Sequence, residues 1–110
     1  MDAVYLHDDH YVDYTPVTPV NSGDVIVIGD LVCVAVRPIP ANTMGSLAAE
    51  GVFNFTKSTA AGSAIVSGTK VYWDAVNRVA TATAGTSKYL GKVCQDAQDG
   101  DSTVRVRLQQ

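Results

Sequence analysis

The chain has 110 residues, of which 46% are hydrophobic and 17% are charged, and its formal net charge is −3 at pH 7. This length fits one domain, and eight Lys and Arg residues scattered along an acidic chain argue against nucleic acid as a partner. No apolar run approaches the ~18 residues of a membrane span, and the first twenty residues hold four acids but no Lys or Arg, unlike a targeting peptide. The charged fraction lies below the ~25% of average soluble domains, which indicates a surface partly covered by another protein.

The first twenty residues differ in kind from the remainder. They contain no hairpin signal, and their two Thr-Pro steps favour extended backbone. Apolar and aromatic side chains that a free tail would waste stand among acids, namely Tyr5, Leu6, Tyr11, Val12 and Tyr14. We therefore expect an extended N-terminal arm over residues 1–14, lying along a partner rather than forming a core strand, and a single β-barrel-like domain over residues 15–110.

Runs rich in Val, Ile, Thr, Tyr and Trp follow at intervals of about eight to twelve residues, separated by Gly, Asp, Asn and Pro. The predicted strands are Val25–Ile28, Leu31–Val36, Gly51–Phe55, Lys70–Asp74, Arg78–Thr83, Tyr89–Cys94 and Thr103–Leu108. The predicted turns are Gly29-Asp30, Asp74–Arg78 and Gln98–Asp101, and residues 57–64 are predicted to form a loop. No window has a helical apolar period, so the fold class is all-β: a small β-barrel or a β-tulip-like sandwich with an extended N-terminal arm.

The side-chain alternation predicts which faces of these strands are buried. In the last strand Val104, Val106 and Leu108 share one face, opposite Thr103, Arg105 and Arg107. In residues 70–74, Val71 and Trp73 are expected to face the core. By contrast VIVI and LVCVAV (residues 25–28 and 31–36) are apolar on both faces, so the outer face of this hairpin must be covered by the N-terminal segment, a loop or another subunit.

A faint internal repeat accompanies these strands. Residues 20–30 (VNSGDVIVIGD) resemble residues 66–75 (VSGTKVYWDA), because Ser-Gly opens a short strand that ends in Asp in both. Two copies are too few for a repeat array. A duplicated hairpin unit within one domain is the alternative.

Cys33 and Cys94 stand in apolar contexts 61 residues apart, and we interpret them as two buried free thiols, with a disulfide between them as the alternative that the sequence leaves open. His7-Asp8-Asp9-His10 contains metal-ligand side chains. A solvated stretch in an arm supplies no rigid ligand shell, so no metal and no cofactor is predicted.

Enzymatic residues are not indicated. His7 and His10 are the only histidines, Glu50 is the only glutamate, and Gly-x-Ser-x-Gly does not occur. Asp96, Asp99 and Asp101 stand in a turn, where acids are common. With no placed acid–base pair, we predict no catalytic residues and no enzyme activity.

Two charged groups of residues suggest surfaces. Lys70, Tyr72, Arg105 and Arg107 resemble a single-strand nucleic-acid platform, but exposed charges on half-buried strands explain them more simply. The arm holds Asp2, Asp8, Asp9 and Asp13, whereas the last third holds Lys88, Lys92, Arg105 and Arg107. We hypothesise that the acidic arm of one copy lies on the basic strands of another, with a salt-sensitive contact.

The segment from SGDVIVIGD to NFTK, with SGTKVYWDAVNRVAT and the closing TVRVRL, resembles a family of small phage and prophage proteins known as capsid cement or head decoration proteins. The resemblance covers about residues 14–108. Its points are Gly23-Asp24, Gly29 to Val32, Val34-Ala35, Gly45, Glu50 to Phe53, Lys57, Gly68, Val71 to Asp74, Gly91 and VRVRL. The chain departs from it at Cys33, where a small residue such as Gly is usual, and in its longer Tyr- and His-rich arm.

The resemblance implies a compact β-barrel or β-tulip with an extended arm, set as a trimer on the capsid surface of the virion and made in the host bacterial cytoplasm. The implied partner is the major capsid protein, to which the arm would add by β-augmentation, and binding only the assembled shell would stabilise that shell. The residues predicted to bind partners are Tyr5, Leu6, His7, His10, Tyr11, Tyr14, Arg105 and Arg107. The alternatives are a baseplate or spike module that recognises a glycan, and a small enzyme subunit or inhibitor.

Overall fold

The computed structural model describes residue 3 and residues 11–110, and this part of the chain forms nine strands and no helix. The strands in chain order are β1 (Tyr11–Tyr14), β2 (Val25–Ile28), β3 (Leu31–Ala35), β4 (Gly45–Ala48), β5 (Glu50–Thr56), β6 (Lys70–Asp74), β7 (Val79–Thr81), β8 (Lys88–Val93) and β9 (Thr103–Gln109). The predicted all-β class is confirmed.

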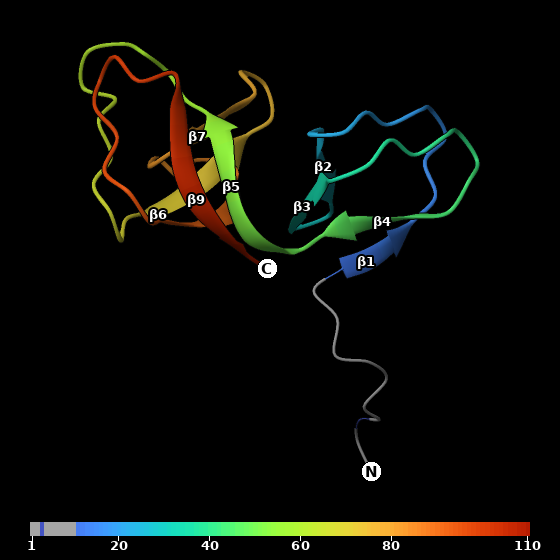
Figure 1. The fold of residues 1–110 in the computed structure, drawn as a ribbon. Helices are drawn as coiled ribbons and strands as arrows, with labels where there is room; N and C mark the ends of the chain where they lie inside the picture. Colours follow the sequence, from blue (N-terminus) through green and yellow to red (C-terminus); the bar gives the residue numbers. More distant parts are fainter. Residues whose placement is uncertain (1–2, 4–10) are drawn as a thin grey trace.

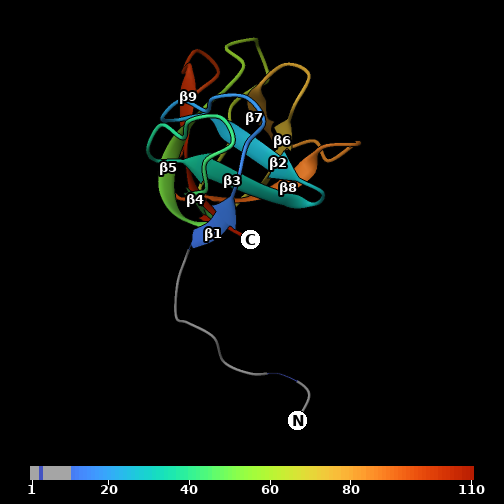
Figure 2. The same ribbon diagram turned by 90° about the vertical axis from the view of Figure 1, so that its right-hand side faces the viewer.

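The strands form two antiparallel sheets, one with four strands in the order β1-β4-β3-β2 and one with five in the order β5-β9-β8-β6-β7. Only Ala49 separates β4 from β5, so one stretch of chain runs from the first sheet into the second (Figure 1). Turned by 90°, the two sheets lie one in front of the other (Figure 2). The fold is therefore a sandwich rather than a closed barrel, which selects the sandwich from the two predicted architectures.

The main core fills the space between the sheets. The five-stranded sheet contributes Phe55, Trp73, Leu90, Val106 and Leu108 to it, and Val25, Val32 and Val34 come from the β2–β3 hairpin. The Phe55 and Trp73 rings meet with their centroids 6.0 Å apart. Trp73 is only 3% exposed, as the alternation in β6 predicts.

A second, smaller core covers the outer face of the four-stranded sheet. Its buried members are Val20, Cys33, Ala35, Ile39 and Leu47. The residues at 20 and 39 come from loops, so the chain itself covers most of the two-sided hairpin, as one of the three predicted alternatives requires. Two parts of the predicted hairpin remain open: its tip, where Val27 and Ile28 are 38% and 39% exposed, and its far end, where Val36 is 40% exposed.

All seven predicted strands are present, each end within two residues of its predicted position. The prediction lacks β1 and β4, which pair with each other in the register Tyr11↔Ala48 to Tyr14↔Gly45. The last four residues of the expected arm are thus an edge strand of this domain. Gly45 shows how closely the chain packs here, because a Cβ at this position would meet the Ile39 side chain at 2.8 Å.

A turn unit precedes β2 and recurs before β6. In the first copy, Val20 forms an isolated bridge with Ile39 through two backbone hydrogen bonds of 2.9 and 2.8 Å. Gly23, with a φ of 90°, then donates its N–H to the Ala35 carbonyl at 2.6 Å. The strand begins two residues later.

The second copy reproduces this geometry. Ile65 bridges Ala97 through hydrogen bonds of 2.9 and 2.8 Å, and Gly68, also with a φ of 90°, donates to the Val93 carbonyl at 2.6 Å. The faint repeat of the sequence is therefore a structural one. It places an equivalent turn at the start of one hairpin in each sheet.

The predicted turns are also present. Ile28 pairs with Leu31 around the two-residue turn, in which Gly29 has a φ of 60°. In the second hairpin the Asp74 carboxylate accepts hydrogen bonds from the Asn77 side chain and backbone and from the Val76 N–H. These bonds, above all those from Asn77, lower the pKa of Asp74.

The two cysteines are free thiols, but they differ in exposure. Cys33 is buried in the second core, and burial raises the pKa of its thiol. Cys94 is exposed, which corrects the prediction of two buried thiols. It follows Val93, the last buried residue of β8, so the strand alternation turns its side chain outward.

Candidate functional site

The outer face of the five-stranded sheet is basic. Four cations are exposed on it: Lys70 on β6, Lys92 on β8, and Arg105 and Arg107 on β9. The residues next to each of them within its strand are buried. This alternation puts the four side chains on one surface, which we call the basic face. The outward directions predicted for Lys70, Arg105 and Arg107 are confirmed.

Three of these residues form a row across neighbouring strands. Lys70 lies opposite Lys92 in the β6–β8 pairing, and Lys92 lies opposite Arg107 in the β8–β9 pairing. Neighbouring strands are about 4.8 Å apart, and like charges placed directly opposite one another destabilise a sheet. In the part of the chain that the structure describes, none of the four has an ion pair.

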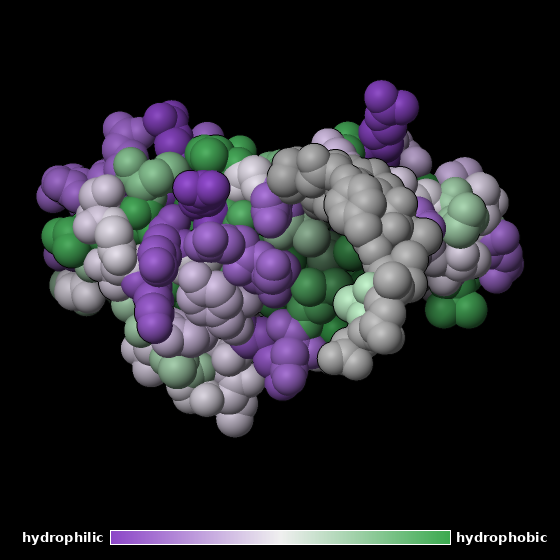
Figure 3. All heavy atoms as spheres, turned by 90° about the horizontal axis from the view of Figure 1, so that it is seen from below, coloured by the Kyte–Doolittle hydropathy of each residue, from purple (hydrophilic) through white to green (hydrophobic). Residues whose placement is uncertain are grey.

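An aromatic pair borders this row. Tyr72 lies opposite Tyr89, and their rings meet edge to face with centroids 6.1 Å apart. Both side chains are half-buried. Viewed from below, hydrophilic side chains gather on the side of the five-stranded sheet, and apolar surface is visible in a hollow nearer the centre (Figure 3).

The structure separates the predicted partner-binding residues. Arg105 and Arg107 lie together on the basic face, whereas Tyr11 and Tyr14 lie on β1 of the other sheet. Tyr11 is 43% exposed, and Tyr14 packs against the second core. The remaining predicted residues, Tyr5, Leu6, His7 and His10, lie outside the described residues.

Lys57 is a buried cation that the sequence analysis missed. It is 5% exposed, and the three N–H groups of its Nζ are shared among five oxygens at 2.8–3.3 Å, those of the Ser63 hydroxyl and of the Ser58, Gln98, Asp99 and Asp101 backbone carbonyls. The ammonium thus joins the loop after β5 to the loop before β9. The sequence holds one indication of its importance, since Lys57 is among the residues that carry the family resemblance.

The Asp99 carboxylate completes this connection between the two loops. It accepts a hydrogen bond from the Ala64 N–H at 2.7 Å. The backbone N–H groups of Gly62 and Ala64 lower the pKa of Asp99, and the charge of Lys57 adds to the effect. The Gln98–Asp101 turn is present as predicted, with an Asp101 N–H to Gln98 carbonyl bond of 3.1 Å.

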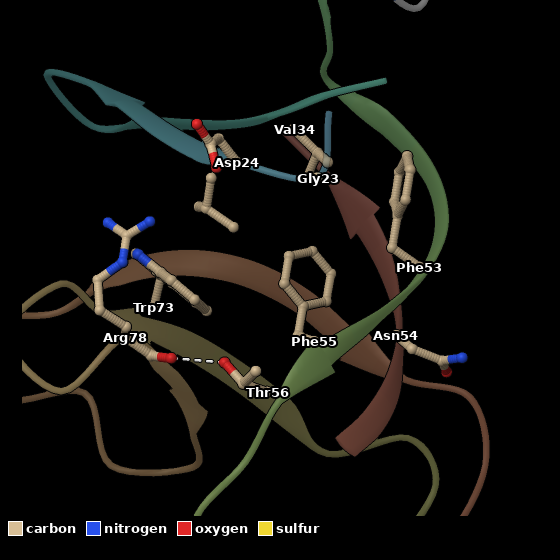
Figure 4. Close-up of a pocket in the computed structure, with 10 residues that line it drawn as sticks. Gly23, Asp24, Val34, Phe53, Asn54, Phe55, Thr56, Trp73 and Arg78 are labelled. Atoms are coloured by element: carbon tan, nitrogen blue, oxygen red, sulfur yellow. Dashed lines mark hydrogen bonds between the residues drawn. The ribbon is translucent and has the colours of Figure 1, made fainter. Parts of the chain in front are cut away.

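A cleft of about 320 Å³ opens between the sheets, beside the aromatic residues of the main core. Phe53, Phe55, Trp73 and Arg78 line it, and the Arg78 guanidinium lies 5.4 Å from the Trp73 ring centroid (Figure 4). Among the residues that the structure describes, the Trp73 Nε1–H has no hydrogen-bond partner. Phe55 and Trp73 are 4% and 3% exposed, so their ring faces are covered and are not offered to a ligand.

The cleft holds no acid–base pair, and no metal-binding group of residues is placed in the described region. The ionisable groups lining the cleft are Asp24 and Arg78, which are not a general acid–base pair. Over residue 3 and residues 11–110, no group of three or more His, Cys, Asp or Glu side chains is placed to hold a metal ion. The His7-Asp8-Asp9-His10 candidate lies outside this range. No described helix could cross a membrane.

The chain matches the family model of the phage cement proteins over residues 6–108. No curated protein and no solved structure gave a match. The matched range includes β1 to β8, β9 as far as Leu108, the basic face, Lys57 and both turn units. Because the match spans more than half of the chain, this protein belongs to the phage cement protein family.

Proposed function

We propose that this protein decorates the outside of an assembled phage head and stabilises contacts between major capsid protein subunits, without catalysing a reaction. The family match over residues 6–108 is the observation that carries the proposal. It supports a structural role at the phage capsid. The proposed partner is the major capsid protein, and the proposed location is the capsid surface after synthesis in the host bacterial cytoplasm.

The distribution of surface supports a binding role. The basic face and the open hairpin tip at Val27 and Ile28 are two exposed regions of different chemistry. The residues proposed to bind partners are Tyr5, Leu6, His7, His10, Tyr11, Tyr14, Arg105 and Arg107. Since Tyr11 and Arg107 lie on different sheets, the protein would contact more than one neighbour, as a cement must. A trimer is the proposed oligomer.

Binding only the assembled shell stabilises it by mass action. At a free concentration one hundred times the dissociation constant, each occupied site contributes about 2.7 kcal/mol. The test is to add the protein to purified expanded heads that lack it, and to measure co-sedimentation and the temperature at which the heads open. We expect saturable binding and a higher opening temperature.

The result that would overturn the proposal is saturation without any rise in opening temperature, or no co-sedimentation at all. A glycan-recognition role is the alternative that the same preparation tests on an array of host polysaccharides. The covered faces of Phe55 and Trp73 do not favour it, because sugars stack on exposed aromatic rings.

A further inference from the structure

The basic face groups four cations on an acidic protein, and the strand register puts two acids on the same side of the sheet, Glu50 on β5 and Asp74 on β6. Four of the eight Lys and Arg residues lie on it, although the whole chain has a net charge of −3. Lys92 has a cation opposite it on each side, Lys70 on β6 and Arg107 on β9. This arrangement costs stability unless an anionic group lies on the face.

The same chain contains a segment of complementary charge. Residues 1–10 include Asp2, Asp8 and Asp9 and no Lys or Arg. Ten residues of extended chain span up to about 33–36 Å. The segment precedes β1, which is an edge strand of the four-stranded sheet, whereas the basic face is the outer surface of the five-stranded sheet (Figure 1).

We propose that the basic face binds residues 1–10 of a second copy of this chain. The Asp2, Asp8 and Asp9 carboxylates of that segment neutralise the row of cations, and Tyr72 and Tyr89 border the contact. The inference goes beyond the proposed function, because it concerns contacts between copies and holds or fails in protein free of capsids. An acidic segment fits better than nucleic acid, since the net negative charge of the protein repels a polyanion.

The structure corrects one residue of the hypothesis drawn from sequence and limits the deletion that can test it. Lys88 is not part of the face, because its Nζ pairs with Asp30 at 2.7 Å beside the β2–β3 turn. Lys70 takes its place. A deletion that tests the contact must end at residue 10, because removing residues 1–20 would also remove β1 and the core residue Val20.

The experiment uses charge reversal in the full-length chain. One variant is Asp8→Lys/Asp9→Lys, a second is Arg105→Glu/Arg107→Glu, and a third combines all four substitutions. Self-association is measured by light scattering at 50 and 500 mM salt. We expect the wild type to associate at low salt and to dissociate at high salt, and each double variant to associate at least tenfold more weakly.

Mixing the two double variants tests whether the contact joins different copies. In the mixture, the lysine segment of one protein meets the glutamate face of the other, and the unchanged segment and face also meet. We expect mixing to restore association, and the fourfold variant to associate alone. Restoration in the fourfold variant without restoration on mixing would mean that the segment folds onto its own domain, which overturns the proposal.

Arg37→Glu is the matched control, because Arg37 is an exposed arginine in the loop after β3 of the other sheet. It should leave self-association unchanged. A loss of association equal to that of Arg105→Glu/Arg107→Glu would mean that association depends on the net charge of the protein and not on the basic face, which overturns the proposal. A wild type that is monomeric at every concentration and salt, or an arginine-dependent binding of single-stranded DNA with unchanged self-association, also overturns the proposal. Head binding by the wild type, measured alongside, reports on the proposed function separately.

Discussion

The two sheets share a turn unit but use their outer faces in different ways. The unit around Gly23 begins a hairpin whose outer face is covered by the second core, with Leu47 fully buried. The unit around Gly68 begins strands whose outer face carries Lys70 and Lys92 in water. One sheet is therefore covered by its own chain over most of both faces, whereas the other exposes a charged face to water.

The loops of the two sheets are also stabilised by different means. All four prolines, Pro16, Pro19, Pro38 and Pro40, lie in the loops beside the four-stranded sheet. Proline reduces the conformational entropy that an unfolded loop loses on folding. The loops after β5 and before β9 contain no proline, and the Lys57 ammonium joins them instead. One region is stiffened by backbone chemistry, the other by a buried cation.

The largest expected effect compares the two cores. Leu108 and Leu47 are both fully buried, the first between the sheets and the second in the smaller outer core. We expect Leu108→Ala to lower the free energy of unfolding by about 4 kcal/mol and Leu47→Ala by about 2–3 kcal/mol, because the smaller core can relax around the lost side chain. Chemical denaturation measures both, and a larger loss at Leu47 would reverse this ranking.

Lys57→Met removes the cation from its five oxygen acceptors. We expect a loss of about 3 kcal/mol in unfolding free energy, since the two loops lose the charged donor that joins them. Lys70→Met is the matched control on the basic face. It should change stability by less than about 0.5 kcal/mol, because it also relieves repulsion with Lys92. Equal losses in both variants would contradict the role given to Lys57.

Strand interiors were predictable from sequence because period-two alternation depends only on local residue types. The closing VRVRL of β9 is an example, because buried Val104 and Val106 alternate along the strand with exposed Arg105 and Arg107. β4 was not predictable, because Gly45–Ala48 (GSLA) lacks β-branched residues and becomes a strand by pairing with β1 and β3. Local propensity carries no information about such partners.

The candidate site shows the same limit. The exposure of Arg105 and Arg107 followed from alternation, but their grouping with Lys92 and Lys70 depends on the strand order β9-β8-β6. The Lys57 contacts were hidden for a further reason. Three of its acceptors are backbone carbonyls 41–44 residues away. Because every residue has a backbone carbonyl, the residue types at these positions do not identify them as acceptors.

The equivalence of the two turns has its own test. Gly23 and Gly68 both have a φ of 90°, and a Cβ at either position would meet no atom within 4 Å. Alanine there suffers backbone strain alone, so Gly23→Ala and Gly68→Ala should each cost about 1–2 kcal/mol, and their thermal unfolding shifts should agree closely. Gly100→Ala, with open space and no positive φ, is the control. Unequal costs would show that the two units differ in the strain that they bear.

The smallest expected effect concerns pH and the loops joined by Lys57. The lowered pKa of Asp99 means that its contribution to stability is complete above the unfolded-state pKa of about 3.9 and is lost as the pH falls through the folded-state pKa. Asp99→Asn should therefore lower the unfolding temperature slightly at pH 7, and the difference from wild type should shrink as the pH falls below about 4. Asp13→Asn, exposed on β1 of the other sheet, controls for the change in net charge. A difference between wild type and Asp99→Asn that stays constant down to pH 2 would mean that the Asp99 side chain acts through its shape rather than its charge, so that the charge joining the two loops would be that of Lys57 alone.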